Sequence, residues 1–472
     1  MERLTALDAS FLEAEDSDPH VSLAIGAVSV VAGPAPRYDE FVSAFAKRVR
    51  AIPRCTQTLH THPFDLGPPE WVEDRHFDIS HHVYRVALPD PGDDAELFRM
   101  IATLMQQRLD RERPLWECWI IEGLTDDRWA VLVKLHHCIA DGIATTQMLA
   151  KLSDSGPGDT FAKNIRAARE PEGRALPLLP TNTNPMAWLS RTWHAAVAAT
   201  AAAQHAAVGV IELTTSLLSS RPESSLTGPL TTLRRYTAAR VKLAEMEKVC
   251  RAFDVTINDV ALAAITDSYR NLLIGRGEQP RHDSLRTLVP VSVRSMKDFH
   301  RTDNRASAML PLLPVDEPDP VRQLELIHSR LMTAKDSGQR EGATAFLSMA
   351  NTVPFALSAW TVRFLTRLPQ RAVSALATNV PGPRSRQKLL GREVLEVLPV
   401  PPIALGLRTG IAMVSYADSF IFGITADHDS APDVDRLSTG IEHAVARLAA
   451  LSRRRRRQRT RPVTRTRRYA RA

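Results

Sequence analysis

The sequence predicts an α/β protein made of two halves that a helix-rich linker joins. Its 472 residues exceed what one ordinary hydrophobic core accommodates. Segments with helical spacing alternate with strand-like segments on both sides of a stretch rich in glycine, proline and alanine. The predicted divisions are a first domain at 1–180, a linker with an alanine-rich helix at 181–228, a second domain at 229–452 and a disordered arginine-rich tail at 453–472.

The first half mixes both kinds of element. Runs rich in β-branched residues predict strands, and runs with apolar residues three and four positions apart predict helices with one buried face. The predicted strands are 21–31, 118–124 and 129–137, and the predicted helices are 38–52 and 95–110.

The linker contains an alanine-rich run at 184–220, where Asn184 and Pro185 form a favourable helix start. A membrane-spanning helix is disfavoured here, because alanine adds little insertion free energy and His194 and His205 would lie in the hydrocarbon. We expect a helix between the domains or one that lies on a membrane surface.

The second half repeats the mixture. Asn258 and Asp259 resemble a helix cap, so a helix is expected to begin there. The predicted helices are 243–253 and 256–273, the predicted strand is 285–295, and a β-hairpin is predicted over 408–427 with its turn near Ala417 and Asp418.

Composition narrows the class of protein. The four scattered cysteines contain no CxxC pair, which fits a reducing compartment and argues against disulfides and a structural zinc. The acidic start has no apolar run of signal-peptide length, so a cytoplasmic protein is expected. The net charge of the chain is +7, and eleven arginines follow Ser452. Residues 1–452 therefore carry a net charge of 7 − 11 = −4, so the positive charge is concentrated in the tail.

The most informative stretch is VLVKLHHCIADGIATT, residues 131–146, in which two histidines end an apolar strand. Strand alternation predicts that the rings of His136 and His137 point apart, unless the strand has already ended. A neutral imidazole there can accept a proton from an attacking hydroxyl. Asp141 is placed to cap the next helix or to form an ion pair, and Gly142 permits a close backbone approach.

Other chemistries lack their markers. No third His, Cys or Glu lies at ligand spacing near the histidines, so no metal is predicted. The chain has no G-x-S-x-G elbow, no Walker A loop and no GxGxxG, which disfavours a serine hydrolase and nucleotide chemistry.

His136–Gly142 resembles the HHxxxDG motif of the CoA-dependent acyltransferase superfamily. Several further blocks, in order, resemble the bacterial wax ester synthase/acyl-CoA:diacylglycerol acyltransferase family. These blocks are LTALDASFL (4–12), RPLWE (113–117), TINDVALA (256–263), VPVSVR (289–294), DNRASAMLPLLP (303–314), TNVPGP (378–383) and FGITADHDSAPDVDRL (422–437).

The resemblance implies two chloramphenicol-acetyltransferase-like domains with an active-site channel between them. It also implies acyl transfer from acyl-CoA, as a co-substrate and not a bound cofactor, to diacylglycerol or a long-chain alcohol. His137 is then the general base, His136 supports it, and Asp141 is structural, with Arg294 as its candidate partner.

The other matching motifs keep two interpretations. Asn258 and Asp259 either contact substrate or cap their helix. Pro114, Leu115 and Trp116 are expected to pack beside the acyl channel, and TNVPGP to shape a turn.

The arginine-rich tail has three interpretations: contact with anionic headgroups of the membrane or of lipid droplets, a dispensable extension, or, least favoured, contact with nucleic acid. Three alternative functions also remain. They are an HHxxxDG enzyme that esterifies another lipid or polyketide alcohol, a glycerol-phosphate acyltransferase, which the chain length disfavours, and an inactive lipid-binding paralogue.

Overall fold

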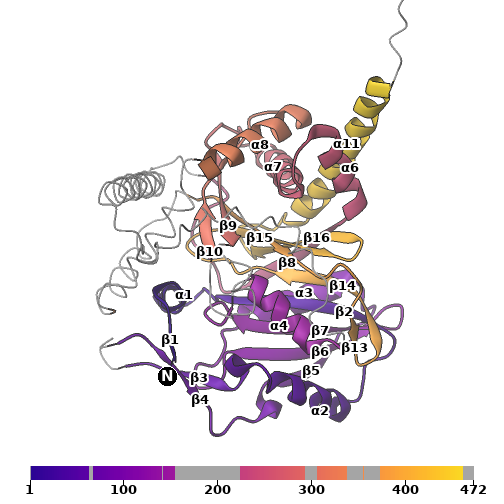
Figure 1. The fold of residues 1–472 in the computed structure, drawn as a ribbon. Coiled ribbons are helices and arrows are strands. Elements are labelled where there is room, and N and C mark those ends of the chain that lie inside the picture. Colours follow the sequence, from indigo (N-terminus) through magenta and orange to yellow (C-terminus); the bar gives the residue numbers. More distant parts are fainter. Residues whose placement is uncertain are drawn as a thin grey trace, which may run out of the picture.

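The computed structural model describes residues 2–62, 67–140, 142–154, 224–292, 306–336, 355 and 373–460. Two large β-sheets lie one above the other, with α6, α7, α8 and α11 over the upper sheet and α2 below the lower one (Figure 1). The α/β class predicted from the sequence is therefore confirmed. The alanine-rich linker helix lies outside the described residues.

The lower sheet has six strands and carries the histidine segment. Their spatial order is β13 (Lys388–Leu389), β14 (Arg392–Val400), β2 (Ala24–Ala32), β7 (Arg128–His136), β6 (Trp116–Leu124) and β5 (Val83–Ala87). All neighbours are antiparallel except β5 and β6. The predicted strands of the first half are present, with ends shifted by at most three residues.

The strand β14 shows that the predicted domain boundary is too simple. It comes from the second half of the chain, yet it pairs with β2 of the first half, from Val394 opposite Val31 to Val400 opposite Gly26. The region 229–452 is therefore not a separate domain, since residues 388–400 complete the sheet of the first half. No local pattern marks such an exchange, because strand pairing depends on distant partners.

The upper sheet is built from the second half. Its spatial order is β10 (Ala306–Met309), β9 (Leu285–Ser292), β12 (Ala375–Pro381), β15 (Thr409–Tyr416), β16 (Ser419–Asp427) and β8 (Arg234–Lys242), and β11 (Leu312–Leu313) also pairs with β9. The strand β12 is parallel to both neighbours, and the other pairs are antiparallel. The predicted hairpin is confirmed, with its turn at Ala417 in a left-handed conformation (φ 50°).

The helices and a small third sheet complete the described fold. The helices are α1 (Ala6–Ser17), α2 (Tyr38–Val49), α3 (Asp94–Gln106), α4 (Gly142–Leu152), α6 (Leu243–Phe253), α7 (Ile257–Gly275), α8 (Pro320–Asp336) and α11 (Asp435–Thr460). The small sheet has the order β1 (Glu2–Arg3), β4 (Glu70–Glu73) and β3 (Gln57–His60). No helix in the described ranges is long and apolar enough to cross a membrane.

Helix ends differ from the prediction at two places. The cap of α7 is Thr256, whose hydroxyl accepts from the N–H of Asp259, while the Asp259 carboxylate accepts from the N–H of Thr256. This reciprocal capping box places Asn258 inside the first turn and corrects its predicted role as the cap. The helix α11 continues to Thr460, so the expected disordered tail is helical over its first eight residues.

The two sheets are packed tightly against each other where β14 crosses β16. Tyr236 is buried and donates its hydroxyl to the Pro399 carbonyl (3.0 Å). A Cβ atom at Gly423 would lie 1.7 Å from the same carbonyl oxygen, so only glycine fits this crossing. Arg240 on β8 forms a bidentate pair with Glu396 on β14 (2.7 and 2.9 Å).

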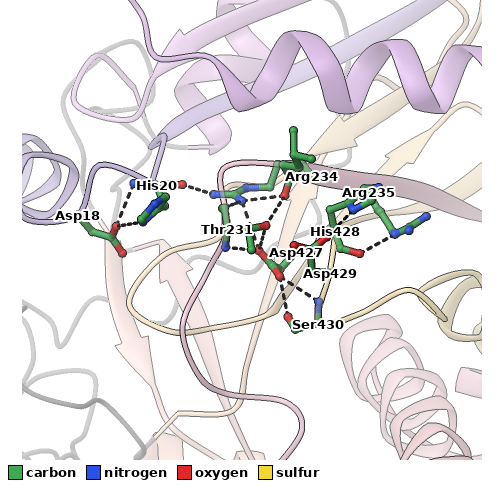
Figure 2. A network of polar contacts seen from close by, with 10 residues as sticks. Asp18, His20, Thr231, Arg234, Arg235, Asp427, His428, Asp429 and Ser430 are labelled. Atoms are coloured by element: carbon green, nitrogen blue, oxygen red, sulfur yellow. Dashed lines mark hydrogen bonds and ion pairs between the residues drawn. The ribbon is translucent and has the colours of Figure 1, made fainter.

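A second set of polar contacts joins the end of α1 to the second half (Figure 2). The buried guanidinium of Arg234 donates to the carbonyls of His20 (2.5 Å) and Leu233 (3.0 Å). The fully buried Asp427 accepts from Thr231 and Ser430, and these hydrogen bonds outweigh burial and lower the pKa of Asp427. The start of the chain is thereby fixed against β8 and β16.

Candidate active site

The histidine segment is held by backbone hydrogen bonds at the point where β7 ends. The N–H of His136 donates to the Leu115 carbonyl and the N–H of His137 donates to the Leu23 carbonyl, each at 3.0 Å. A turn follows, closed by the bond from the Ile139 N–H to the His136 carbonyl (2.9 Å). The strand ends at His136, so alternation no longer sets the direction of His137. Both rings lie against α1 and do not take opposite faces of a strand.

His136 is a buried side chain with a defined hydrogen-bonding state. It is 1% exposed, and its Nδ1 accepts the backbone N–H of Cys138 at 3.2 Å. Because Nδ1 accepts a hydrogen bond, the N–H of the ring is on Nε2. Nε2 lies 3.5 Å from Oε2 of Glu15. This ring is therefore enclosed by protein behind the turn and is not open to substrate.

Glu15 is the anion at the centre of this network and is also 1% exposed. Its Oε1 accepts the N–H of Leu23 (2.9 Å), and its Oε2 accepts from the Arg111 guanidinium (2.9 Å). Burial alone would raise the pKa of Glu15, but His136, the Leu23 N–H and Arg111 together lower that pKa to about 2. Glu15 is therefore a carboxylate at every physiological pH.

His137 is the partly exposed histidine of the pair. Its ring stacks on Phe11 of α1, with centroids 4.1 Å apart and an interplanar angle of 21°. A flat apolar surface on one side restricts the rotation of the imidazole. An imidazole held in this way at a strand end can act as a general base toward a hydroxyl that reaches it.

Of the predicted residues next to the histidines, the structure describes Gly142 but not Asp141 or its candidate partner. Gly142 begins α4 directly after the histidine turn. Asp141 and Arg294 lie outside the described residues, so their predicted ion pair stays a prediction. The helix α4 contacts β12, the strand of the TNVPGP block. A Cβ atom at Gly382 would lie 2.2 Å from the Ser415 carbonyl oxygen, which explains the glycine of that block by close packing.

Pro114, Leu115 and Trp116 are buried structural residues that support the histidine strand. The Leu115 carbonyl binds the His136 N–H, as described above. The indole N–H of Trp116 donates to the Cys55 carbonyl (2.9 Å), and its ring stacks on His82 at 4.6 Å. These contacts show that the motif packs behind the histidine strand, and its predicted place beside the acyl channel stays a prediction.

Asn258 and Asp259 belong to α7, which packs with α11, α6 and α8 over the upper sheet (Figure 1). His136 and His137 end a strand of the lower sheet. Asp259 is 3% exposed, and besides closing the capping box it pairs with Nδ1 of His328 at 2.8 Å. Its contacts support the capping interpretation.

Phe11, Glu15 and Arg111 were missed by the sequence analysis. One signal was present, because the block LTALDASFL (4–12) contains Phe11 and ends three residues before Glu15. Phe11 and Glu15 are about 120 positions from the histidines in the sequence and Arg111 about 25, and only the packing of α1 against the end of β7 brings Phe11 and Glu15 close to them. Within the described ranges, no group of three or more His, Cys, Asp or Glu side chains could hold a metal ion.

Comparison with known proteins identifies the family. The sequence profile of the wax ester synthase/diacylglycerol acyltransferase catalytic domain matches residues 4–261, and that of the WS/DGAT C-terminal domain matches residues 302–449. The chain belongs to this family of acyltransferases. A relative in this WS/DGAT family, the probable diacylglycerol O-acyltransferase tgs1 of Mycobacterium tuberculosis, is 54% identical over 96% of this chain and 97% of its own length.

Solved structures agree on the fold of this WS/DGAT protein. The wax ester synthase/diacylglycerol acyltransferase from Marinobacter aquaeolei VT8 matches with a TM-score of 0.64 and 23% identity, over 96% of this chain and all of that one. The first condensation domain of the CDA synthetase matches with a TM-score of 0.59 and 16% identity, over 95% of each chain. The predicted chloramphenicol-acetyltransferase-like α/β architecture is thereby confirmed.

Proposed function

We propose that this WS/DGAT protein transfers the acyl group of a long-chain acyl-CoA to the free hydroxyl of diacylglycerol and so makes triacylglycerol. The observation that carries the proposal is His137, a partly exposed imidazole fixed at the end of β7, in a chain 54% identical to a relative named for this acceptor. Long-chain alcohols are the second candidate acceptor, because the Marinobacter structure is named for both products.

The chemistry needs one proton to be moved and returned. His137 accepts the hydroxyl proton while the acceptor oxygen attacks the thioester carbonyl carbon. The tetrahedral intermediate collapses with cleavage of the C–S bond, and the imidazolium returns the proton to the CoA sulfur. The ester and free CoA are the products, and no covalent enzyme intermediate or bound cofactor takes part. His136 and Glu15 hold the turn that carries the base.

Acceptor choice is tested by incubating the purified protein with radiolabelled palmitoyl-CoA and either dipalmitoylglycerol or hexadecanol. The proposal predicts labelled triacylglycerol as the main product. Labelled wax ester alone would favour the second candidate. Absence of both products with a folded protein would point to the inactive lipid-binding paralogue.

Both acceptor and product are lipids, and the end of α11 offers a surface to hold the enzyme at a membrane or lipid droplet. Figure 1 shows α11 extending beyond the body of the protein. Arg453 and Arg454 are exposed there, and Arg455 lies over the Phe253 ring at 4.8 Å. Basic residues near an anionic surface contribute about 1 kcal/mol each at low salt.

This part of the proposal is tested by replacing the eleven arginines after Ser452 with glutamine, which keeps the helix propensity. Binding is measured by sedimentation with vesicles that contain phosphatidylglycerol, with phosphatidylcholine vesicles as the control. We expect the native chain to bind only the anionic vesicles and to be released by salt, and the glutamine variant not to bind. Equal binding by both chains would refute a role of the tail and leave the acyl transfer proposal intact.

A further inference from the structure

Helix α1 contacts both histidines with two side chains that are one helical turn apart. Phe11 and Glu15 are four positions apart, so they project from the same face of α1. Phe11 stacks on the ring of His137, and Glu15 pairs with the ring of His136. We propose that Phe11 and Glu15 are positioning residues through which α1 fixes the catalytic imidazole. This inference rests on the proposed role of His137 as the base.

Glu15 reaches the backbone of His137 from two sides. On one side its Oε1 accepts the N–H of Leu23, whose carbonyl accepts the N–H of His137 at 3.0 Å. On the other side its Oε2 faces Nε2 of His136, whose Nδ1 accepts the N–H of Cys138. The residues before and after His137 are thus tied to one carboxylate. Shortening or neutralising that group displaces the backbone that carries the base.

The charge of Glu15 is required because its neighbours are all donors. Leu23 N–H, the Arg111 guanidinium and the Nε2–H of His136 face its two oxygens. Glutamine has the same shape but one oxygen and one NH₂ group. Whichever way the amide is turned, its NH₂ group faces a donor. If His136 moves its proton to Nδ1 to avoid this, that nitrogen then faces the Cys138 N–H.

The helix α1 is itself held in place by several hydrogen bonds, so it can fix the position of the His137 ring. Arg108 donates to the carbonyls of Val21 (2.8 Å) and Asp18 (2.5 Å), and it also contacts the carbonyl of Glu15. The Arg234 network holds the next residues against the second half, through the His20 carbonyl (Figure 2). Phe11 also packs against a buried apolar cluster to which both halves contribute, made of Val21, Leu23, Leu230 and Ile403. Both halves of the protein therefore set the position of α1.

The test measures kcat and KM for palmitoyl-CoA and dipalmitoylglycerol in Glu15→Gln and Phe11→Leu. A misplaced base lowers kcat, by about 10- to 100-fold for Glu15→Gln, since small displacements of a reacting group cost rate. KM for both substrates stays within twofold. Phe11→Leu keeps an apolar side chain but lacks a flat ring, and it lowers kcat about threefold or more. Phe11→Tyr keeps the ring, so its kcat stays close to that of the native chain.

The matched control is Asp16→Asn. Asp16 is the adjacent carboxylate and pairs with the same Arg111 at 2.8 Å. Unlike Glu15 it is half exposed, so its replacement tests the loss of one carboxylate beside Arg111 at a solvent-exposed position. Thermal unfolding of every variant confirms that it is folded at the assay temperature, and Phe11→Leu keeps the proposal testable if Glu15→Gln does not fold.

The outcomes separate this inference from the proposed function. If Glu15→Gln and Phe11→Leu lower kcat no more than Asp16→Asn does, the positioning role is wrong. A rise in KM without a fall in kcat would also overturn it, because α1 would then bind substrate. His137→Ala, assayed in parallel, reports on the proposed function alone, since its inactivity is expected whether or not α1 positions the ring.

Discussion

The buried carboxylate of Glu15 makes the stability of the protein depend on pH in a defined window. Its pKa is lowered from 4.5 to about 2 in the folded protein, against the opposing effect of burial. A lowered carboxyl pKa stabilises the folded state above the unfolded value, and this contribution is lost as pH falls from 4.5 toward 2. At 1.36 kcal/mol per pH unit, the full contribution is about 3 kcal/mol at neutral pH.

Glu15→Gln removes this titration and leaves the other carboxylates unchanged. We expect the variant to be less stable than the native chain by about 3 kcal/mol at pH 7, and the difference to shrink to roughly 2 kcal/mol at pH 3.5. The assay is urea unfolding followed by tryptophan fluorescence at several pH values between 7 and 3.5. A difference that stays constant over this range would refute the buried ionised state of Glu15. Asp16→Asn, at a half-exposed site, serves as the control.

Two further predictions concern the packing around the site. Gly423→Ala should destabilise the protein by about 3 kcal/mol or more, because its Cβ would lie 1.7 Å from the Pro399 carbonyl oxygen. The control Gly391→Ala has nothing within 4 Å of its Cβ and should cost only about 1 kcal/mol, for its positive φ. Equal urea midpoints for the two variants would contradict the packing of β14 over β16. Trp116→Phe should cost about 1–3 kcal/mol in thermal unfolding, because the buried Cys55 carbonyl loses its donor, and an unchanged melting temperature would contradict that contact.

The sequence predicted those parts of the fold that depend on local pattern. The one-sided helix of Phe41, Phe45 and Val49 is present, with all three side chains buried. The hairpin turn at Ala417 is also where turn chemistry placed it. The HHxxxDG motif located the end of β7 correctly, since an apolar strand followed by Asp-Gly is visible within sixteen residues.

The rest depends on contacts between distant segments. The strand β14 joins the sheet of the first half because of its partner β2, more than 350 residues earlier in the chain. Lys134 is fully buried on β7, because its ammonium donates to the carbonyls of Leu104 (2.9 Å) and Gln107 (2.7 Å) at the end of α3. The link from Glu15 to His136 has the same origin. Pattern reasoning assigns a charged residue to the surface and has no means of naming a buried partner.

The role of His137 as the general base is measured by the rate of acyl transfer in His137→Ala. The measurement is the formation of labelled triacylglycerol from radiolabelled palmitoyl-CoA and dipalmitoylglycerol, with circular dichroism to confirm the fold. If His137 is the base, the variant is folded and its kcat is lower by about a thousandfold, the loss expected for a general base. A folded His137→Ala variant that turns over within tenfold of the native rate would contradict it.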